Sequence, residues 1–389
     1  MKMLAIDAVL GAALLVAVIA VFTMEPPAKP DAGPQLSVPD PEPAPARPVR
    51  PLRLAVTPES NAFDDMGRLL DKLGQSYVYR PMPFDDLLDE AKVGQFDVIF
   101  VTCSGYTDTW LGQEGGASPR GGQLFGPNEA TFAKAKQVLR KFVANGGTLY
   151  ASDLHYNLIA KCFPEIVDES LMQRGSPQTL RAEVVDPGLR QMIGDGIDLT
   201  FDQTDWRPAA ISGEGVTVFL RGEFATIDGQ RATAPLLVTF PHGQGNVIFT
   251  SFHNEKQQSE QEMQLLKFLV FSAVTAGVDA EATRTMARGG FAQTKKNLFA
   301  ASGNAETVTQ AYDNKEVADL QFVLAFSDQG ATLELRVQGP GGMDEKKRGT
   351  STITIDAPQA TVGEWKYTIT AVSVPSENFP FTITVGKKR

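Results

Sequence analysis

The sequence has few cysteines and no excess of positive charge. The chain has two cysteines among 389 residues, too few for a disulfide framework, and Cys103 and Cys162 lack the spacing of a zinc site. The sequence does not decide whether they pair. The formal net charge is -10, so no broad basic surface is available to neutralise phosphates, and we expect no nucleic-acid partner.

The start of the chain lacks the pattern of a folded domain. Residues 8–24 form an uncharged apolar run that, with residues 3–6 before it, approaches the length needed to cross a bilayer. No small-x-small cleavage site follows, so residues 1–24 are predicted to be a retained transmembrane anchor that contacts the membrane through residues 3–24, with a cleaved signal peptide as the alternative. Residues 25–51 hold ten of the 25 prolines and are predicted to be an extended spacer.

Residues 52–277 alternate between strand and helix patterns, which is typical of an α/β domain. The continuous apolar run at residues 97–103 predicts a buried strand, and a later helix is expected to end at Gly146 and Gly147 in a left-handed cap. We therefore expect a mostly parallel, doubly wound sheet. Further strands are predicted at residues 52–56, 77–79, 179–185, 216–221, 235–240 and 245–252, with helices at residues 63–73, at residues 84–91 and from a Ser259/Glu262 capping box to Gly277.

The end of the chain changes from helical spacing to strict alternation. Residues 278–312 are predicted to be a connector with a helix near residues 293–300. Residues 313–389 are predicted to form an antiparallel β-sandwich, because five alternating segments are separated by Gly and Pro turns. These segments are residues 320–326, 333–337, 353–355, 365–369 and 379–385.

The middle of the chain is organised around residues 146–159, where a strand turns directly into a helix. Such a turn places one side chain, here Asp153, at the carboxyl edge of the sheet, where open α/β folds bind ligands. Aspartate also tolerates a left-handed backbone better than most residues. His253 and Glu255 come directly after the predicted strand at residues 245–252, so we expect their side chains to share a site with Asp153.

This order of elements, with a late strand ending in His-x-Glu, resembles the class I glutamine amidotransferase-like fold over the whole predicted α/β segment. In that family the sharp turn reads Gly-x-Cys-x-Gly and carries the nucleophile, and the His-x-Glu pair supplies a base and its orienting carboxylate. The resemblance assigns these two roles to His253 and Glu255. Ala151, Asp153 and His155 stand in place of the first glycine, the cysteine and the second glycine, so we expect no glutamine amidotransferase activity.

Three interpretations of Asp153 and His253 remain open: a hydrogen-bonded remnant that orders the site, non-covalent ligand recognition, and hydrolysis by His253 with Asp153 or a divalent metal. A metal site would need Asp153, His155, His253 and Glu255 to converge, a donor set suited to a borderline divalent ion. No cofactor is expected.

Cys103 and Ser104 complete the candidate ligand-binding residues. Cys103 ends a predicted strand and precedes a glycine-rich loop, within which residues 112–122 are predicted to cover the site. Cysteines in such positions are commonly buried, so we expect Cys103 to be unreactive. The predicted ligand-binding set is therefore Asp153, His155, His253, Glu255, Cys103 and Ser104.

The alternating tail, in particular residues 333–342 and 363–369, is similar to the prepeptidase C-terminal type of sandwich found on secreted bacterial proteins. That similarity implies an accessory domain outside the cytoplasm. With the anchor and spacer, it predicts a single-pass protein of the bacterial inner membrane with the bulk of the chain in the periplasm. We expect a binding or scaffold protein with a protein partner in the cell envelope, with a small-molecule ligand as an option and an envelope hydrolase as the competing class.

Overall fold

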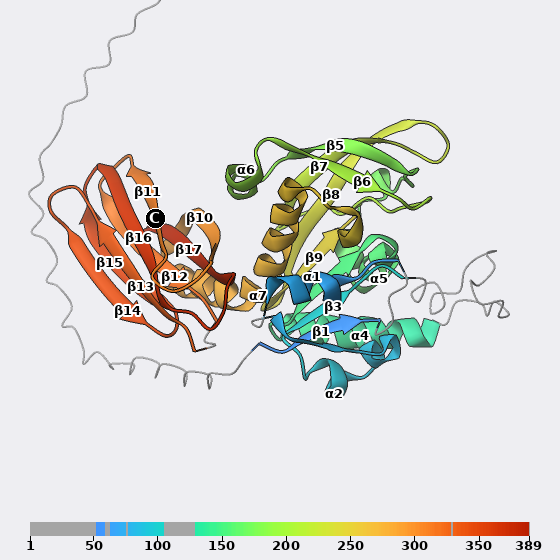
Figure 1. Ribbon diagram of the computed structural model, residues 1–389, viewed down its shortest axis with the longest axis horizontal. Helices are drawn as coiled ribbons and strands as arrows, with labels where there is room; N and C mark the ends of the chain where they lie inside the picture. The colour runs from blue at the N-terminus through green and yellow to red at the C-terminus, as the bar shows by residue number, and fades with distance from the viewer. Residues whose placement is uncertain (1–51, 59–62, 75–76, 105–128, 328–329, 389) are drawn as a thin grey trace, which may run out of the picture. The chain divides into compact units, whose positions relative to one another are not determined.

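The computed structural model describes most of the chain beyond the proline-rich segment (Figure 1). The described residues are 52–58, 63–74, 77–104, 129–327 and 330–388. The predicted anchor, the spacer and the loop at residues 112–122 lie outside them.

The first part of the described chain forms one nine-stranded sheet, whose strands are β1 (Leu54–Thr57), β2 (Tyr79–Pro81), β3 (Val98–Val101), β4 (Thr148–Ser152), β5 (Gln178–Val184), β6 (Gly196–Phe201), β7 (Thr217–Ala225), β8 (Arg231–His242) and β9 (Gly245–Thr250). Their order is β2-β1-β3-β4-β9-β8-β7-β5-β6. The pairs from β2 to β9 are parallel, and the pairs from β9 to β6 are antiparallel.

The predicted α/β class is confirmed, but the prediction of a mostly parallel sheet is wrong, because the sheet is mixed. Strands β8 and β9 are joined by a turn at Gly243 and Gln244, and a connection this short can join only antiparallel strands. The parallel half contains the strands whose carboxyl ends carry the candidate site residues.

Helices cover both faces of this sheet, and each face has its own hydrophobic core. The first core includes residues of α1 (Met66–Leu73), α6 (Pro187–Ile193) and α7 (Glu260–Arg288). The second includes residues of η2 (Phe84–Leu88), α2 (Glu90–Val93), α4 (Glu129–Ala144) and α5 (Tyr156–Cys162). Strand side chains alternate between the two cores, with Val98 and Phe100 in the first and Ile99 and Val101 in the second. The remaining short helices are η3 (Asp153–His155), η4 (Pro164–Ile166), η5 (Glu169–Leu171) and η6 (Asn254–Lys256).

The predicted helix signals at Gly146 and Ser259 are confirmed. Gly146 has φ +103 after the end of α4, and Ser259 forms a capping box with Glu262 at the start of α7. The predicted end at Gly277 is wrong, because α7 continues to Arg288. Its extension buries Ala282 and Met286 in a small cluster with side chains of the following domain, and this burial outweighs the roughly 1 kcal/mol that glycine costs inside a helix.

The second part of the described chain forms two four-stranded antiparallel sheets. Their strands are β10 (Phe291–Ala301), β11 (Thr307–Asn314), β12 (Ala318–Ala325), β13 (Thr332–Gln338), β14 (Asp344–Gly349), β15 (Ile353–Ala360), β16 (Gly363–Ser373) and β17 (Phe379–Lys388). The orders are β10-β17-β12-β15 and β11-β16-β13-β14, and apolar residues of both sheets fill one shared core. The helix predicted near residues 293–300 is wrong, since β10 occupies this part of the predicted connector and pairs with β17.

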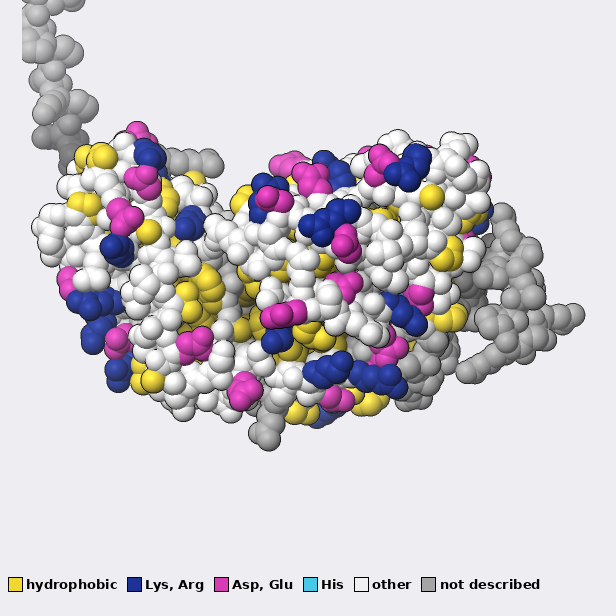
Figure 2. Space-filling view, turned by 45° about the horizontal axis from the view of Figure 1, so that its top comes forward, with side chains coloured by type: hydrophobic (Ala, Val, Ile, Leu, Met, Phe, Trp, Pro, Cys, Tyr) yellow, Lys and Arg dark blue, Asp and Glu magenta, His cyan; other side chains and the backbone are white. Residues whose placement is uncertain are grey.

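Helix α7 is long and apolar enough to cross a membrane by length and composition alone, but more than half of its apolar stretch is buried inside the protein. We interpret it as a core helix. On the face shown in Figure 2, Lys and Arg side chains are interspersed with Asp and Glu over the described surface, so this face has no extended basic area.

Candidate functional site

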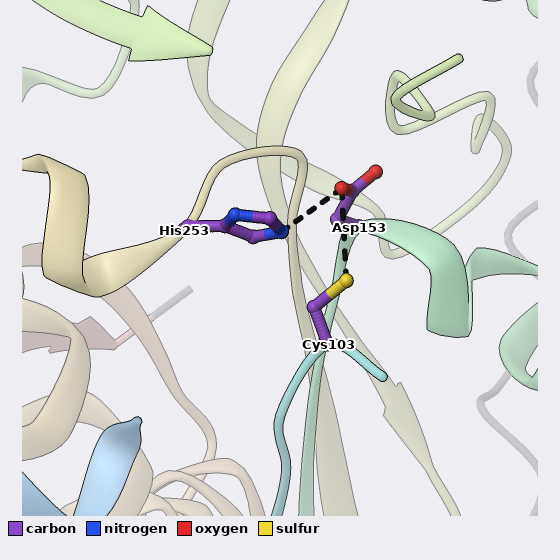
Figure 3. Close-up of side chains that lie close together, drawn as sticks. All are labelled: Cys103, Asp153 and His253. Atoms are coloured by element: carbon purple, nitrogen blue, oxygen red, sulfur yellow. Dashed lines mark hydrogen bonds and ion pairs between the residues drawn. The ribbon is translucent and has the colours of Figure 1, made fainter. Parts of the chain in front are cut away.

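The site lies where three neighbouring parallel strands end. Strands β3, β4 and β9 are adjacent and in register, with Val101 opposite Ala151 and Ser152 opposite Thr250. The residues that follow these strands therefore emerge at one edge of the sheet. In this way the sheet brings Cys103, Asp153 and His253 together from distant parts of the sequence (Figure 3).

Asp153 occupies the sharp turn between β4 and α5, as expected. Its φ is +45, in the left-handed region, and its side chain is 1% exposed. One carboxylate oxygen, Oδ1, accepts a hydrogen bond of 2.8 Å from the backbone N–H of Arg207. The other, Oδ2, faces the side chains of Cys103 and His253.

His253 lies between two carboxylates and is 2% exposed. Its Nε2 is 3.1 Å from Oδ2 of Asp153, and its Nδ1 is 2.9 Å from Oδ1 of Asp202. The ring N–H directions are not aligned with these oxygens, so the contacts are ion pairs rather than well-directed hydrogen bonds. Burial opposes the charged ring, but Asp153, Asp64 and Asp202 together outweigh it and raise the pKa of His253 above its ordinary value.

Two of these carboxylates, Asp64 and Asp202, were missed by the sequence analysis. Asp64 precedes α1 and is 1% exposed; it accepts hydrogen bonds from the backbone N–H groups of Asp65 and Glu255 and from the amide of Asn254. Burial raises its pKa, against the opposing effects of His253 and these hydrogen bonds.

Asp202 directly follows β6, which lies at the far edge of the sheet from the strands that carry the site. No strand was predicted at residues 196–201, so the signal used for Asp153, a side chain placed just after a strand, did not identify Asp202. Gln257 ties this strand end to the site, because its side-chain amide donates to the carbonyl oxygens of both Thr200 and His253.

Cys103 lies beside the turn and is fully buried. Its Sγ is 3.7 Å from Oδ2 of Asp153, and its backbone N–H donates to Oγ of Ser152 at 2.9 Å. Burial and the nearby Asp153 raise the pKa of the Cys103 thiol well above its ordinary value. Cys162 is buried in α5 and is likewise a free thiol.

In the protein without bound metal, we expect Cys103 to react with iodoacetamide much more slowly than an exposed cysteine does. The Cys103 thiol is protonated and has no exposed surface. Mass spectrometry of the folded and urea-unfolded protein measures this. Labelling of Cys103 at similar rates in both states would contradict the expectation.

His155 and Glu255 do not join the cluster. His155 is fully buried, with Nε2 2.8 Å from the carbonyl oxygen of Thr102 and 3.0 Å from Oγ of Ser104, and its ring stacks on Phe84. Burial lowers the pKa of His155 to about 4. The carboxylate of Glu255 instead pairs with Arg68 at 2.8 Å.

The four residues predicted as metal candidates therefore do not converge. The family resemblance also placed the carboxylate that orients His253 at Glu255, whereas in the structure Asp202 and Asp153 contact the ring. The physical reason is local: Glu255 lies in η6, where its backbone N–H is bound by Asp64 and its side chain reaches Arg68 at the surface.

A polar cavity of about 390 Å³ lies next to this cluster. It is lined mainly by residues of α1 and of the segment after His253, among them Arg68, Asn254, Glu255 and Gln257. Its lining does not include Cys103, Asp153 or His253. The cavity therefore offers a ligand hydrogen-bond partners and charges, but no contact with the buried imidazole.

The raised pKa of His253 predicts that the stability of the fold falls as the pH rises above 6.5. The folded protein holds the imidazole proton more tightly than the unfolded chain, so this stabilisation is fully present below the unfolded pKa of 6.5 and is lost as the pH rises through the folded pKa. His155, whose folded pKa is about 4, acts in the opposite direction only below that window.

We therefore expect the free energy of unfolding of the metal-free protein to fall as the pH rises above 6.5 and to stay level in His253→Gln. Urea denaturation at a series of pH values above 6.5 measures this. The same slope in the variant would show that another group is responsible.

No family model and no curated protein matches the chain. Among solved structures, two cytoplasmic proteins from Salmonella typhimurium are similar at 16% and 17% sequence identity, with TM-scores of 0.33 and 0.36. They cover 56% and 57% of this chain and 98% and 96% of their own. A beta-galactosidase from Bacillus circulans sp. alkalophilus, at 11% identity and a TM-score of 0.31, covers 82% of this chain and 41% of its own. These likenesses are too distant to carry an argument about function.

Proposed function

We propose that this chain is a membrane-anchored, extracytoplasmic binding or scaffold protein whose amidotransferase-like α/β domain does not catalyse a reaction. The observation that carries the proposal is the burial of the Asp153–His253 pair. A general base must present a free lone pair to its substrate, whereas this ring lies between two carboxylates and is 2% exposed. The group at the turn is a carboxylate 1% exposed, and the nearest thiol is fully buried.

The same pair supports a structural role at the centre of the sheet. Asp153 joins the end of β4 to the segment after β9 through His253 and to the backbone of Arg207. The nearby polar cavity gives the domain a surface on which a small ligand or a partner segment can be recognised without contact with that pair. The anchor, the periplasmic location and the prepeptidase-like identity of the second domain rest on the sequence alone.

The activity test is a panel of ester, amide and glycan substrates assayed with wild type and His253→Ala. The proposal expects no turnover that depends on His253. Turnover by wild type that disappears in the variant would overturn it.

The location test is protease treatment of intact cells whose outer membrane has been permeabilised. Before treatment, the protein is expected in the membrane fraction. After treatment, the part of the chain beyond the anchor is expected to be degraded. Full protection, or recovery in the soluble fraction, would contradict the anchored periplasmic arrangement.

A hydrolase is the second candidate, and one observation favours it. Cys103, Asp153 and His253 present a sulfur, an oxygen and a nitrogen within 4.8 Å of one another, which is a donor set that could activate water on a metal. The substrate panel repeated with added zinc or manganese tests this candidate, since only a hydrolase would show turnover that needs both the metal and His253.

A further inference from the structure

Three different metal-binding atoms meet at the carboxyl edge of the sheet (Figure 3). They are Sγ of Cys103, a carboxylate oxygen of Asp153 and Nε2 of His253, all within 4.8 Å of one another. The three side chains are 0%, 1% and 2% exposed. Each follows its own strand in the parallel half of the mixed sheet, so the sheet, rather than long flexible side chains, sets their convergence.

The spacing fits a tetrahedral ion. With ordinary zinc bond lengths, the nitrogen–oxygen and sulfur–oxygen edges of a tetrahedron are about 3.4 Å and about 3.6 Å long. In the structure Nε2 of His253 is 3.1 Å and Sγ of Cys103 is 3.7 Å from Oδ2 of Asp153. These two distances match the tetrahedral edges to within about 0.3 Å, and the third, between Nε2 and Sγ, is within 4.8 Å.

The imidazole lies between the other donors and a further carboxylate. Its Nε2 is 3.1 Å from Oδ2 of Asp153 and its Nδ1 is 2.9 Å from Oδ1 of Asp202, and the ring is almost fully buried. A metal would take Nε2, which leaves Nδ1 as the N–H that faces Asp202. A carboxylate behind a ligating histidine is a common arrangement that fixes the ring and its tautomer.

We propose that Cys103, Asp153 and His253 bind one zinc ion, with Asp202 as the positioning carboxylate. Thiolate and imidazole donors suit zinc and do not suit magnesium or calcium, which take oxygen ligands. Three protein donors leave the fourth tetrahedral position without a protein ligand.

The charges balance in the bound site. Zinc is held by the thiolate of Cys103, the carboxylate of Asp153 and the neutral imidazole of His253, so the two positive charges of the ion are offset by two negative charges. The thiol proton, and any proton on Nε2 of the imidazole, pass to solvent when the ion binds.

The test uses full-length protein, stripped of metal with a chelator and dialysed against zinc or cobalt. We expect one equivalent of zinc per chain, and with cobalt a thiolate-to-metal charge-transfer absorption. Cys103→Ala is expected to lose this absorption and to bind zinc at least about 100-fold more weakly. Cys162→Ala is the matched control, because Cys162 is also a buried free thiol but lies in α5, and it is expected to behave as wild type.

Three results would overturn the inference: no stoichiometric zinc on wild type, no charge-transfer absorption with cobalt, or equal binding by Cys103→Ala and wild type. The first two are measured on wild type and so do not depend on whether a variant folds.

The role of Asp202 has its own test. Asp202→Asn is expected to keep one zinc and the cobalt absorption but to lose about 10- to 100-fold in affinity. Asp198→Asn is the control, since Asp198 lies on the preceding strand β6, is exposed, and pairs with Arg181. Equal affinities in Asp202→Asn and Asp198→Asn would overturn the positioning role.

The zinc site goes beyond the proposed function, and the two can be disproved by different results. Failure to bind zinc leaves the non-catalytic proposal standing, whereas turnover by the zinc-loaded protein would overturn that proposal and leave the metal site in place.

Discussion

Replacing Asp153 with alanine in the metal-free protein is expected to lower the free energy of unfolding by about 3–5 kcal/mol, the range for removing one partner of a buried ion pair. The change leaves His253 without its countercharge at Nε2 and removes the acceptor of the Arg207 backbone N–H. It also places a residue less tolerant of the left-handed backbone at φ +45. Urea denaturation in the presence of a chelator measures the loss.

Asp153→Asn separates the charge from the backbone requirement. Asparagine tolerates the left-handed turn and keeps an oxygen for Arg207, so we expect a smaller loss, about 1–3 kcal/mol. Asp198→Asn, at an exposed ion pair, serves as the surface control and is expected to change stability by less than about 0.5 kcal/mol. If Asp153→Ala proved no more destabilising than this control, the pair would not stabilise the fold.

Gly245→Ala is expected to destabilise the protein by about 3 kcal/mol or more, because the added carbon meets backbone that cannot rotate away. A Cβ at Gly245 would lie 2.1 Å from the carbonyl oxygen of Gly147 and 2.3 Å from that of Val143. These atoms belong to the last turn of α4 and to the residue before β4, so relief requires β9 to move relative to both. That movement would separate His253 from Asp153.

Gly303→Ala is the matched control, since a Cβ there meets nothing within 4 Å and the backbone is not in the left-handed region. It is expected to change stability by less than about 0.5 kcal/mol. The measurement is thermal or urea unfolding of both variants beside wild type. Equal stabilities of the two variants would show that the close approach of β9 to the α4–β4 turn is not needed.

Much of the local structure could be predicted because it depends on short-range patterns. Alternating apolar residues identified β12, β13, β15, β16 and β17, and a Ser259/Glu262 capping box identified the start of α7. The turn at Asp153 was recognised because a strand passes directly into a helix there. Each of these signals lies within a few residues of the element that it predicts.

The secondary-structure predictions that were wrong concern segments whose structure depends on contacts with distant parts of the chain. Residues 293–300 pair with β17 at the end of the chain, and this pairing makes them a strand rather than a helix. Helix α7 passes Gly277 because its last turns bury Ala282 and Met286 beside Val323. No local pattern reports such contacts.

The sequence by itself determined that Asp153 occupies the turn and that His253 follows a later strand. It also determined that an α/β part is followed by an antiparallel β part. Only the tertiary structure decided which side chains meet. It placed Asp202 and Cys103 against the Asp153–His253 pair and directed His155 and Glu255 to other partners. The physical reason is that strand order and register, which no single segment encodes, decide which strand ends become neighbours.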